Sequence, residues 1–175
     1  MTYALTGDSI TICRVDYADV HDAAALVMLL DGYAQDVAGG SELLTAEVKR
    51  GLPEALSQRP QAFGVLAWAE DANQPTGRVG VGLVNCFEGF STFACKPLVI
   101  VHDVVVVPAW RGHRIAQRML HVVEAMARER GACKLTLEVL SGNHSALRAY
   151  EREGFAAYTL DPKMGHAQFL QKLLD

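Results

Sequence analysis

The sequence has few cysteines and no paired cysteine motif. Its four cysteines, Cys13, Cys86, Cys95 and Cys133, lie far apart, and each lies in or beside an apolar run. This pattern favours buried free thiols over a disulfide framework or a cysteine metal site. Free thiols are typical of a reducing compartment, so we expect a cytoplasmic protein. The six histidines show no ligand spacing such as HExxH, so no metal site is predicted.

Long apolar runs and an excess of positive charge are also missing. No stretch approaches the roughly 18 apolar residues that a membrane helix needs, and the N-terminal residues lack a signal-peptide core. We therefore expect neither export nor a membrane partner. The sixteen Lys and Arg and twenty Asp and Glu give a net charge of −4. This balance disfavours a nucleic-acid partner that is held by phosphate neutralisation.

The length and composition are those of one folded domain. The chain has 175 residues, of which 50% are hydrophobic and 21% charged, and it contains no repeat or low-complexity tract. We expect a single domain spanning residues 1–175. A monomer and a homodimer both remain open.

Hydrophobic periodicity predicts the element order β α α β β β α β α β β. The predicted strands cover residues 9–15, 62–69, 78–85, 98–107, 134–140, 155–160 and 168–174. The predicted helices run from a cap at Asp16 or Asp19 to residue 33, over 43–57 as one helix or as a pair divided near Gly51 and Pro53, from 115 to 131, and over 143–153. The run over 98–107 is polar only at His102 and Asp103, so we expect a central strand that is covered on both faces.

A basic loop joins that apolar strand to the helix that follows it. The strand ends at Val107, and Arg111, Gly112, His113 and Arg114 precede the helix. Free amides and the positive end of a helix dipole form a site for an anion, for which a diphosphate is the obvious candidate. The alternative is an ordinary basic surface turn, in which Gly112 reverses the chain.

A second pattern lies on the helix predicted near residue 143. Asn143 and Tyr150 are seven residues apart, which is nearly two turns, so their side chains share one helix face. Both can therefore contact one ligand. The alternative for Tyr150 is an aromatic residue that packs against the sheet.

Together these segments resemble the GNAT superfamily of N-acetyltransferases over residues 98–155. The family's loop reads R/Q-x-x-G-x-G/A after a central strand, and its later helix reads N-x-x-A-x-x-x-Y followed by G-F. The second pattern matches at every position: Asn143, Ala146, Tyr150, Gly154 and Phe155. The loop matches at Arg111 and Ala116, but Arg114 replaces the central glycine. Glycine there permits close backbone approach to phosphate, so the departure concerns cofactor affinity.

The resemblance implies a mixed α/β fold of the α+β type and a binding mode for acetyl-CoA. The implied fold is a central, mostly antiparallel mixed sheet of six to seven strands, flanked by about four helices. The strand residues implied to pair with the pantetheine arm are Val104, Val105 and Val106. The residues implied to hold the diphosphate are Arg111, Gly112, His113, Arg114, Ile115, Ala116 and Gln117. Asn143 would bind near the pantetheine, and Tyr150 would protonate the leaving thiolate.

Three residues compete for the role of general base. By resemblance, Glu138 stands where ribosomal-protein acetyltransferases carry their base, and Asp103 and His102 lie where polyamine acetyltransferases carry acidic residues. Successive strand residues point to opposite faces, so His102 and Asp103 should not reach one groove without a β-bulge. The order of preference is Glu138 and Asp103 ahead of His102.

The implied function is direct acetyl transfer from acetyl-CoA to a primary amine of a small molecule or peptide, through a tetrahedral intermediate. No cysteine has a neighbouring base, which disfavours a covalent acyl-enzyme. The alternative is a non-catalytic acyl-CoA-binding or regulatory module, for which Arg114 in place of glycine is the direct sign. The aromatic and acidic stretch 87–93 suits an amine acceptor, or is a surface loop.

Overall fold

The computed structural model describes residues 5–7, 9–36, 39–159, 161, 163, 165 and 167–174. The chain divides into two compact units, Met1–Leu137 and Glu138–Asp175, which are described separately below. The expectation of a single domain over the whole chain stays a prediction.

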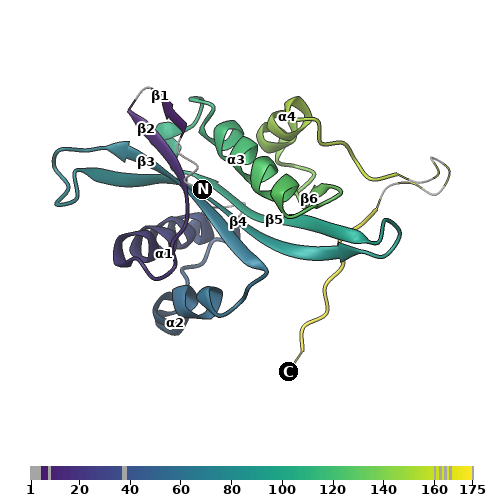
Figure 1. Cartoon of the computed structure of the whole chain (residues 1–175), viewed down its shortest axis with the longest axis horizontal. Coiled ribbons are helices and arrows are strands. Elements are labelled where there is room, and N and C mark those ends of the chain that lie inside the picture. Colours follow the sequence, from purple (N-terminus) through teal and green to yellow (C-terminus); the bar gives the residue numbers. More distant parts are fainter. Residues whose placement is uncertain are drawn as a thin grey trace. The chain divides into compact units, whose positions relative to one another are not determined.

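The first unit is built on one sheet of six strands in sequence order (Figure 1). The strands are β1 (Leu5–Gly7), β2 (Ile10–Arg14), β3 (Ala62–Glu70), β4 (Arg78–Ser91), β5 (Lys96–Val106) and β6 (Leu135–Leu137). Neighbouring strands are antiparallel except β5 and β6, which are parallel. This mixed, mostly antiparallel sheet with its helices confirms the predicted fold class.

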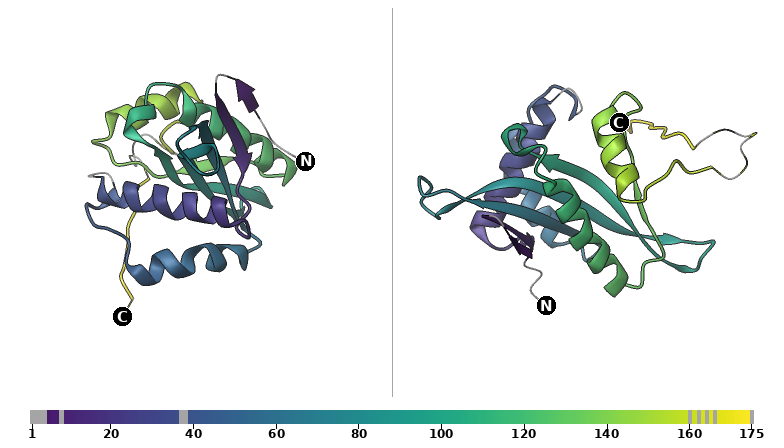
Figure 2. Two further views of the ribbon diagram at one scale, coloured as in Figure 1. Left: turned by 90° about the vertical axis from the view of Figure 1, so that its left-hand side faces the viewer. Right: turned by 90° about the horizontal axis from the view of Figure 1, so that it is seen from above.

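Helices cover both faces of this sheet. Helices α1 (Val20–Gln35) and α2 (Ala46–Ser57) lie on one face, and α3 (Ile115–Glu129) lies on the other (Figures 1 and 2). The α1 cap is Asp19, whose carboxylate accepts from the amides of His21 and Asp22 at 2.9 Å each. Of the two alternatives for 43–57, the structure has the single helix, with Pro53 inside α2. Capping by Thr45 and burial of Leu56 hold the two ends of that helix.

The most deeply buried strand is β3 rather than β5. Every residue of β3 up to Ala69 is buried, whereas β5 alternates between buried, half-buried and exposed positions. The expectation that β5 is covered on both faces is therefore wrong. The reason is its place in the sheet: β3 and β4 are central, whereas β5 lies beside the short strand β6.

Two apolar layers pack against the sheet. On one face, Leu26 and Leu29 of α1 pack with Leu66, Trp68 and Leu83 of the sheet. On the other face, the apolar side of α3 is buried at Ile115, Met119, Leu120, Val122, Val123, Met126 and Ala127. Helix α3 approaches the sheet closely at Gly82: a Cβ there would lie 2.9 Å from the Met119 Cε, so the buried Met119 side chain would have to shift.

The second unit contains helix α4 (His144–Arg152). The two closing strands expected here do not form: residues 155–159 and 168–174 are irregular, and Leu160 lies outside the described residues. A backbone hydrogen bond from Ala167 N to Tyr158 O (3.1 Å) links the two segments without starting a ladder. The apolar side chains of the last segment stay exposed at Phe169, Leu170, Leu173 and Leu174, so no burial drives strand formation.

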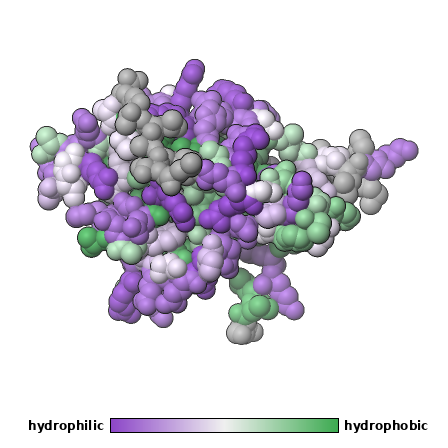
Figure 3. Space-filling view, viewed as in Figure 1, coloured by the Kyte–Doolittle hydropathy of each residue, from purple (hydrophilic) through white to green (hydrophobic). Residues whose placement is uncertain are grey.

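The cysteines, the lengths of the helices and the surface of α2 can be compared with the predictions. Within the described residues, all four cysteines are free as expected, but Cys95 and Cys133 are exposed, because they lie in turns beside β5 and β6. None of the described helices combines the length and apolar character needed to cross a membrane. Hydrophilic side chains dominate the outward side of α2 (Figure 3).

Replacing Leu66 with alanine should lower the free energy of unfolding by about 2–5 kcal/mol, because it leaves a cavity in a packed core. Leu66 is 0% exposed. Leu43→Ala is the matched control, since that side chain is 58% exposed, and it should change stability by less than about 0.5 kcal/mol. Denaturant titration measures both, and equal effects would contradict this assignment of the core.

Candidate active site

One edge of β5 is open over its last residues. Parallel pairing joins Val99 to Leu135 and ends at Val101 with Leu137. Beyond that point β5 continues to Val106 and stays paired with β4 on its other side. In the described part of the first unit, no strand follows on the open side. Unpaired backbone groups on a strand edge can accept an extended ligand as an added strand.

The open edge leads directly into the start of α3. A short 3-10 helix, η2 (Pro108–Trp110), and a turn with Gly112 at φ +86° connect them. The first helical amide bond runs from Arg118 N to Arg114 O at 3.0 Å. The preceding amides of Ile115, Ala116 and Gln117 therefore have no acceptor within the helix. They lie at the positive end of the helix dipole, so this turn suits an anion.

Arg114 takes the backbone conformation that the family's glycine would adopt. Its φ is +56° and its ψ +22°, which is the left-handed region, and its exposed side chain makes no capping hydrogen bond. A Cβ in this region costs roughly 1–2 kcal/mol, and glycine avoids that cost. The sequence departs from the family pattern here, but the backbone geometry does not need the glycine.

The Arg111 side chain contacts groups of the protein itself, and its predicted contact with the diphosphate stays a prediction. Its Nη2 lies 2.9 Å from the Oδ2 of Asp36, the C-cap residue of α1, and its Nε donates to Val106 O at 3.1 Å. Arg111 therefore ties the loop to α1 and to the end of β5. The exposed side chain of Arg114 places a positive charge beside the helix start, and the exposed His113 lies next to it.

A β-bulge interrupts β5 at the two polar residues of its apolar run. Asn85 pairs with Asp103, but the next β4 residue, Cys86, pairs with Val101, so His102 is the extra residue. The His102 Nδ1 lies 3.3 Å from the Asp103 Oδ1. The expected obstacle, that these side chains point to opposite faces, is therefore removed by the bulge.

The Asp103 carboxylate is held from β4 and lies near α1. The buried Asn85 donates from Nδ2 to the Asp103 Oδ2 at 3.0 Å. Burial raises the pKa of Tyr33 in α1, and the negative charges of Asp103 and Asp36 raise it further. Burial also raises the pKa of the Cys86 thiol, again with Asp103 adding to the effect. Both Tyr33 and Cys86 therefore stay neutral at pH 7, with burial as the main cause.

The aromatic and acidic stretch 87–93 is mostly part of a strand. Strand β4 continues to Ser91, so the hairpin turn comes later than expected. Glu88 pairs with Arg130 Nη1 at 3.0 Å, and the same guanidinium lies 4.4 Å from the centre of the Phe63 ring. The negative charge of Glu88 is therefore already matched.

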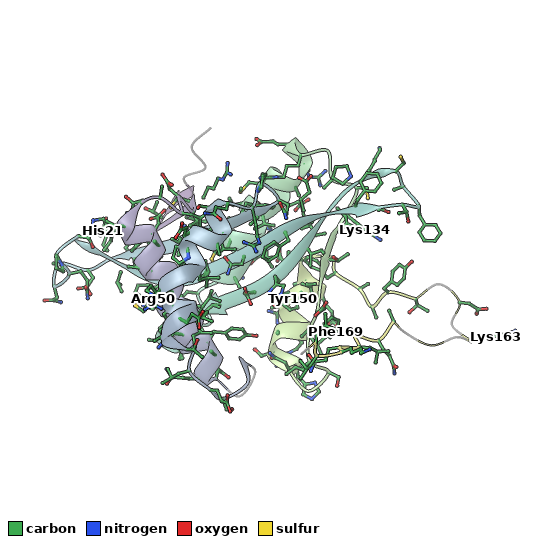
Figure 4. The ribbon with its side chains drawn as sticks, turned by 90° about the horizontal axis from the view of Figure 1, so that it is seen from below. His21, Arg50, Lys134, Tyr150, Lys163 and Phe169 are labelled. Carbon is green, nitrogen blue, oxygen red and sulfur yellow. The ribbon has the colours of Figure 1, made fainter. Side chains whose placement is uncertain are left out.

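Three predicted site residues belong to the second unit. Glu138 is exposed at its start. Asn143 is the N-cap of α4, and its Oδ1 accepts from Ala146 N at 3.1 Å. Tyr150 is half-buried on the same helix (Figure 4), with its ring edge-on to Phe155 at 5.9 Å between centroids. The side-chain oxygen of Asn143 is thus used as a helix cap. The catalytic and binding roles of all three residues stay predictions.

The sequence reasoning missed two features of the first unit. One is Asn85, whose only signal was that it ends an apolar run with a polar residue. The other is the tether between Arg111 and Asp36, for which charge alone gave no pairing. Among the described residues, no three His, Cys, Asp or Glu side chains are grouped to hold a metal ion.

The fold and the site define the class of protein. Residues 30–155 match the Acetyltransferase (GNAT) family, and the chain belongs to that family. Members of this family use acetyl-CoA as the acyl donor. The resemblance in the loop and in α4 is thus confirmed at the level of the family.

Two curated acetyltransferases are similar to this chain in sequence. A streptothricin acetyltransferase of Streptomyces lavendulae is 38% identical over 98 residues, which is 54% of this chain and 51% of the relative, so the match spans about half of that relative's length. The uncharacterized N-acetyltransferase YhfO of Bacillus subtilis (strain 168) is 28% identical over 142 residues, covering 81% of this chain and 89% of that protein.

Solved structures show the same fold. The crystal structure of a probable acetyltransferase has a TM-score of 0.73 at 21% identity, covering 94% of this chain and 98% of that chain. An aminoglycoside acetyltransferase, meta-AAC0020 from an uncultured soil metagenomic sample, was solved in complex with sisomicin. It has a TM-score of 0.72 at 15% identity, covering 95% and 97% of the two chains.

Replacing Arg114 with glycine should raise the free energy of unfolding by about 1 kcal/mol, because glycine adopts the left-handed region without a Cβ clash. Arg114→Ala is the matched control: it removes the same positive charge from the helix start but keeps the Cβ, so it should be less stable than Arg114→Gly by about that amount. Thermal denaturation compares the two proteins. Equal stabilisation by both would attribute the effect to charge and contradict the backbone explanation.

Proposed function

We propose that this protein is an acetyl-CoA-dependent N-acetyltransferase that transfers the acetyl group directly to a primary amine. The observation that carries the proposal is the continuity of the open β5 edge with the free amides at the start of α3. An extended arm that ends in a diphosphate fits such a surface, because a strand edge binds the arm and a helix N-terminus binds the anion. Membership of the family supports the same donor.

The proposal assigns the strand, loop and helix residues to parts of acetyl-CoA. Val104, Val105 and Val106 pair with the pantetheine arm through their backbone groups. The amides from Gly112 to Gln117 hold the diphosphate. Arg111 pairs with Asp36 and shapes the loop, so its side chain is not assigned to the phosphate. Asn143 binds near the pantetheine, and Tyr150 gives a proton to the leaving thiolate.

The proposed acceptor is a small molecule that is cationic before it reacts. The supporting observation is the Asp103 carboxylate, whose negative charge helps to raise the pKa of the nearby Tyr33, because a carboxylate next to an aromatic ring favours an ammonium group. The names of two similar proteins support a small cationic acceptor, because one is called a streptothricin acetyltransferase and the other an aminoglycoside acetyltransferase. Peptide amino termini are the second class to be examined.

Coenzyme A should bind the protein in isothermal titration, whereas pantetheine without its diphosphate should bind far more weakly, because the helix start recognises the anion. Thiol release from acetyl-CoA should then depend on an amine from a panel of streptothricin, aminoglycosides, polyamines and peptides. Binding that is indifferent to the diphosphate would contradict the assigned loop. Tight binding with no amine-dependent thiol release would favour a non-catalytic acyl-CoA-binding module.

Tyr150→Phe should lower kcat by about 10²- to 10⁴-fold, because it removes the proton donor and keeps the ring. Its affinity for coenzyme A and its melting temperature should stay nearly unchanged. Tyr158→Phe is the matched control in the same unit, where the ring is 56% exposed, and it should retain activity. If kcat hardly changes and stability drops, Tyr150 is a packing residue.

A further inference from the structure

The bulge in β5 lies where the strand loses its parallel neighbour. Pairing with β6 ends at Val101, and the extra residue of the bulge is the next one, His102. If the diphosphate binds at the start of α3, the pantetheine arm runs back along Val106 to Val104. The thioester is at the far end of that arm, so it arrives at the bulge. His102 and Asp103 are therefore the first side chains beyond the proposed arm.

A chain of polar groups leads from the core to the surface at this point. Asn85 is 4% exposed, and the side chains of Asp103 and His102 are 21% and 62% exposed. Asn85 contacts one carboxylate oxygen of Asp103 at 3.0 Å, and the other lies 3.3 Å from the His102 Nδ1. A buried amide thus fixes a carboxylate, and the carboxylate lies against an accessible imidazole.

The neighbouring backbone makes room for this arrangement. A Cβ at Gly64 would lie 3.2 Å from the Asn85 Oδ1 and 2.9 Å from the Val15 Cγ2. That Oδ1 is buried and has no partner among the described residues. The contact with Asp103 therefore sets the orientation of the amide, because the reversed amide would place its oxygen against a carboxylate oxygen.

We propose that His102 is the general base that takes the proton from the acceptor ammonium, and that Asp103, held by Asn85, is the residue that positions its imidazole. The inference rests on the proposed function and deepens it. It reverses the order expected from the sequence, in which His102 came last. Geometry decides this, because Asp103 is partly buried and already engaged, whereas most of the His102 side chain is exposed.

In the proposed reaction the acceptor nitrogen loses two protons, one before it attacks and one as the amide forms. The ammonium R–NH₃⁺ gives one proton to the His102 Nε2, and the freed nitrogen lone pair attacks the thioester carbonyl carbon of acetyl-CoA. A C–N bond forms, and the tetrahedral intermediate then breaks its C–S bond. The nitrogen loses a second proton as the amide forms, and the departing thiolate takes one up to leave as coenzyme A thiol. The imidazolium returns its proton to water, so one proton is released overall.

The groups around His102 support an electrostatic role for Asp103. The Phe87 ring of β4 stands edge-on to the imidazole at 5.5 Å. Tyr33 of α1 and Cys86 of β4 are neutral at pH 7, because burial raises the pKa of each. Glu88 is paired with Arg130 at 3.0 Å. The Asp103 carboxylate oxygen lies 3.3 Å from the His102 Nδ1, where it favours the Nδ1–H tautomer and leaves Nε2 to accept a proton.

The test uses His102→Gln with the acceptor found in the amine panel. The kcat/KM at pH 7 should fall by about 10²-fold or more, while coenzyme A affinity and melting temperature stay unchanged. The rate of the variant should then climb with pH as free amine becomes available. His21→Gln is the matched control, since His21 is an exposed histidine at the start of α1 (Figure 4), and it should retain the wild-type profile.

Asp103→Asn separates positioning from proton transfer. It should reduce kcat/KM less than His102→Gln does, and the loss should fall on kcat rather than on KM, because the imidazole keeps its proton-accepting nitrogen but loses the carboxylate that orients it. A larger loss in Asp103→Asn than in His102→Gln would make the carboxylate the base and overturn the proposal. Full activity in His102→Gln, with loss in Glu138→Gln, would overturn it in favour of Glu138.

The two levels of proposal fail in different ways. If wild-type protein acetylates no amine in the panel, the proposed function fails and this inference fails with it. If wild-type protein is active and His102→Gln is equally active at pH 7, only the inference fails.

Discussion

The end of parallel pairing between β5 and β6 is the constraint on which the candidate site depends. Strand β6 has three residues and leaves β5 after Val101. A longer β6 would satisfy the edge of β5 as far as Val106, and no backbone groups would remain there for a ligand. The same shortness leaves β5 only partly covered, which explains why an apolar run as continuous as that of a buried strand is half-exposed.

The loop after β5 shows how a family position can change residue and keep its geometry. The left-handed backbone at Arg114 turns the chain so that α3 begins at Ile115 with its first amides unbonded. Glycine would reach this conformation more easily, but the tether from Arg111 to Asp36 and the buried face of α3 hold the loop from both sides. Arg114 then places a positive charge where an anion is expected to bind.

Local signals were readable from the sequence, and pairings between distant residues were not. The cap at Asp19 and the pattern from Asn143 to Tyr150 depend on residues within one helix, so spacing alone located the second and narrowed the first to Asp16 or Asp19. The contact of Arg111 with Asp36 joins positions 75 residues apart. Strand register has the same character: the length of β4 and the bulge at His102 follow from how two strands align, and composition does not encode that alignment.

The bulge and the open edge also explain each other. Inserting His102 removes a ladder contact with β4, and within a fully paired strand it would disturb the other neighbour as well. Here the other side of β5 carries no described partner from His102 onward, so the disturbance is confined to one side. Strand β5 has an open edge and also brings two consecutive side chains together. A bulge disturbs such a strand least at the point where its pairing with β6 ends. The position of His102, directly after Val101, satisfies both requirements with a single inserted residue.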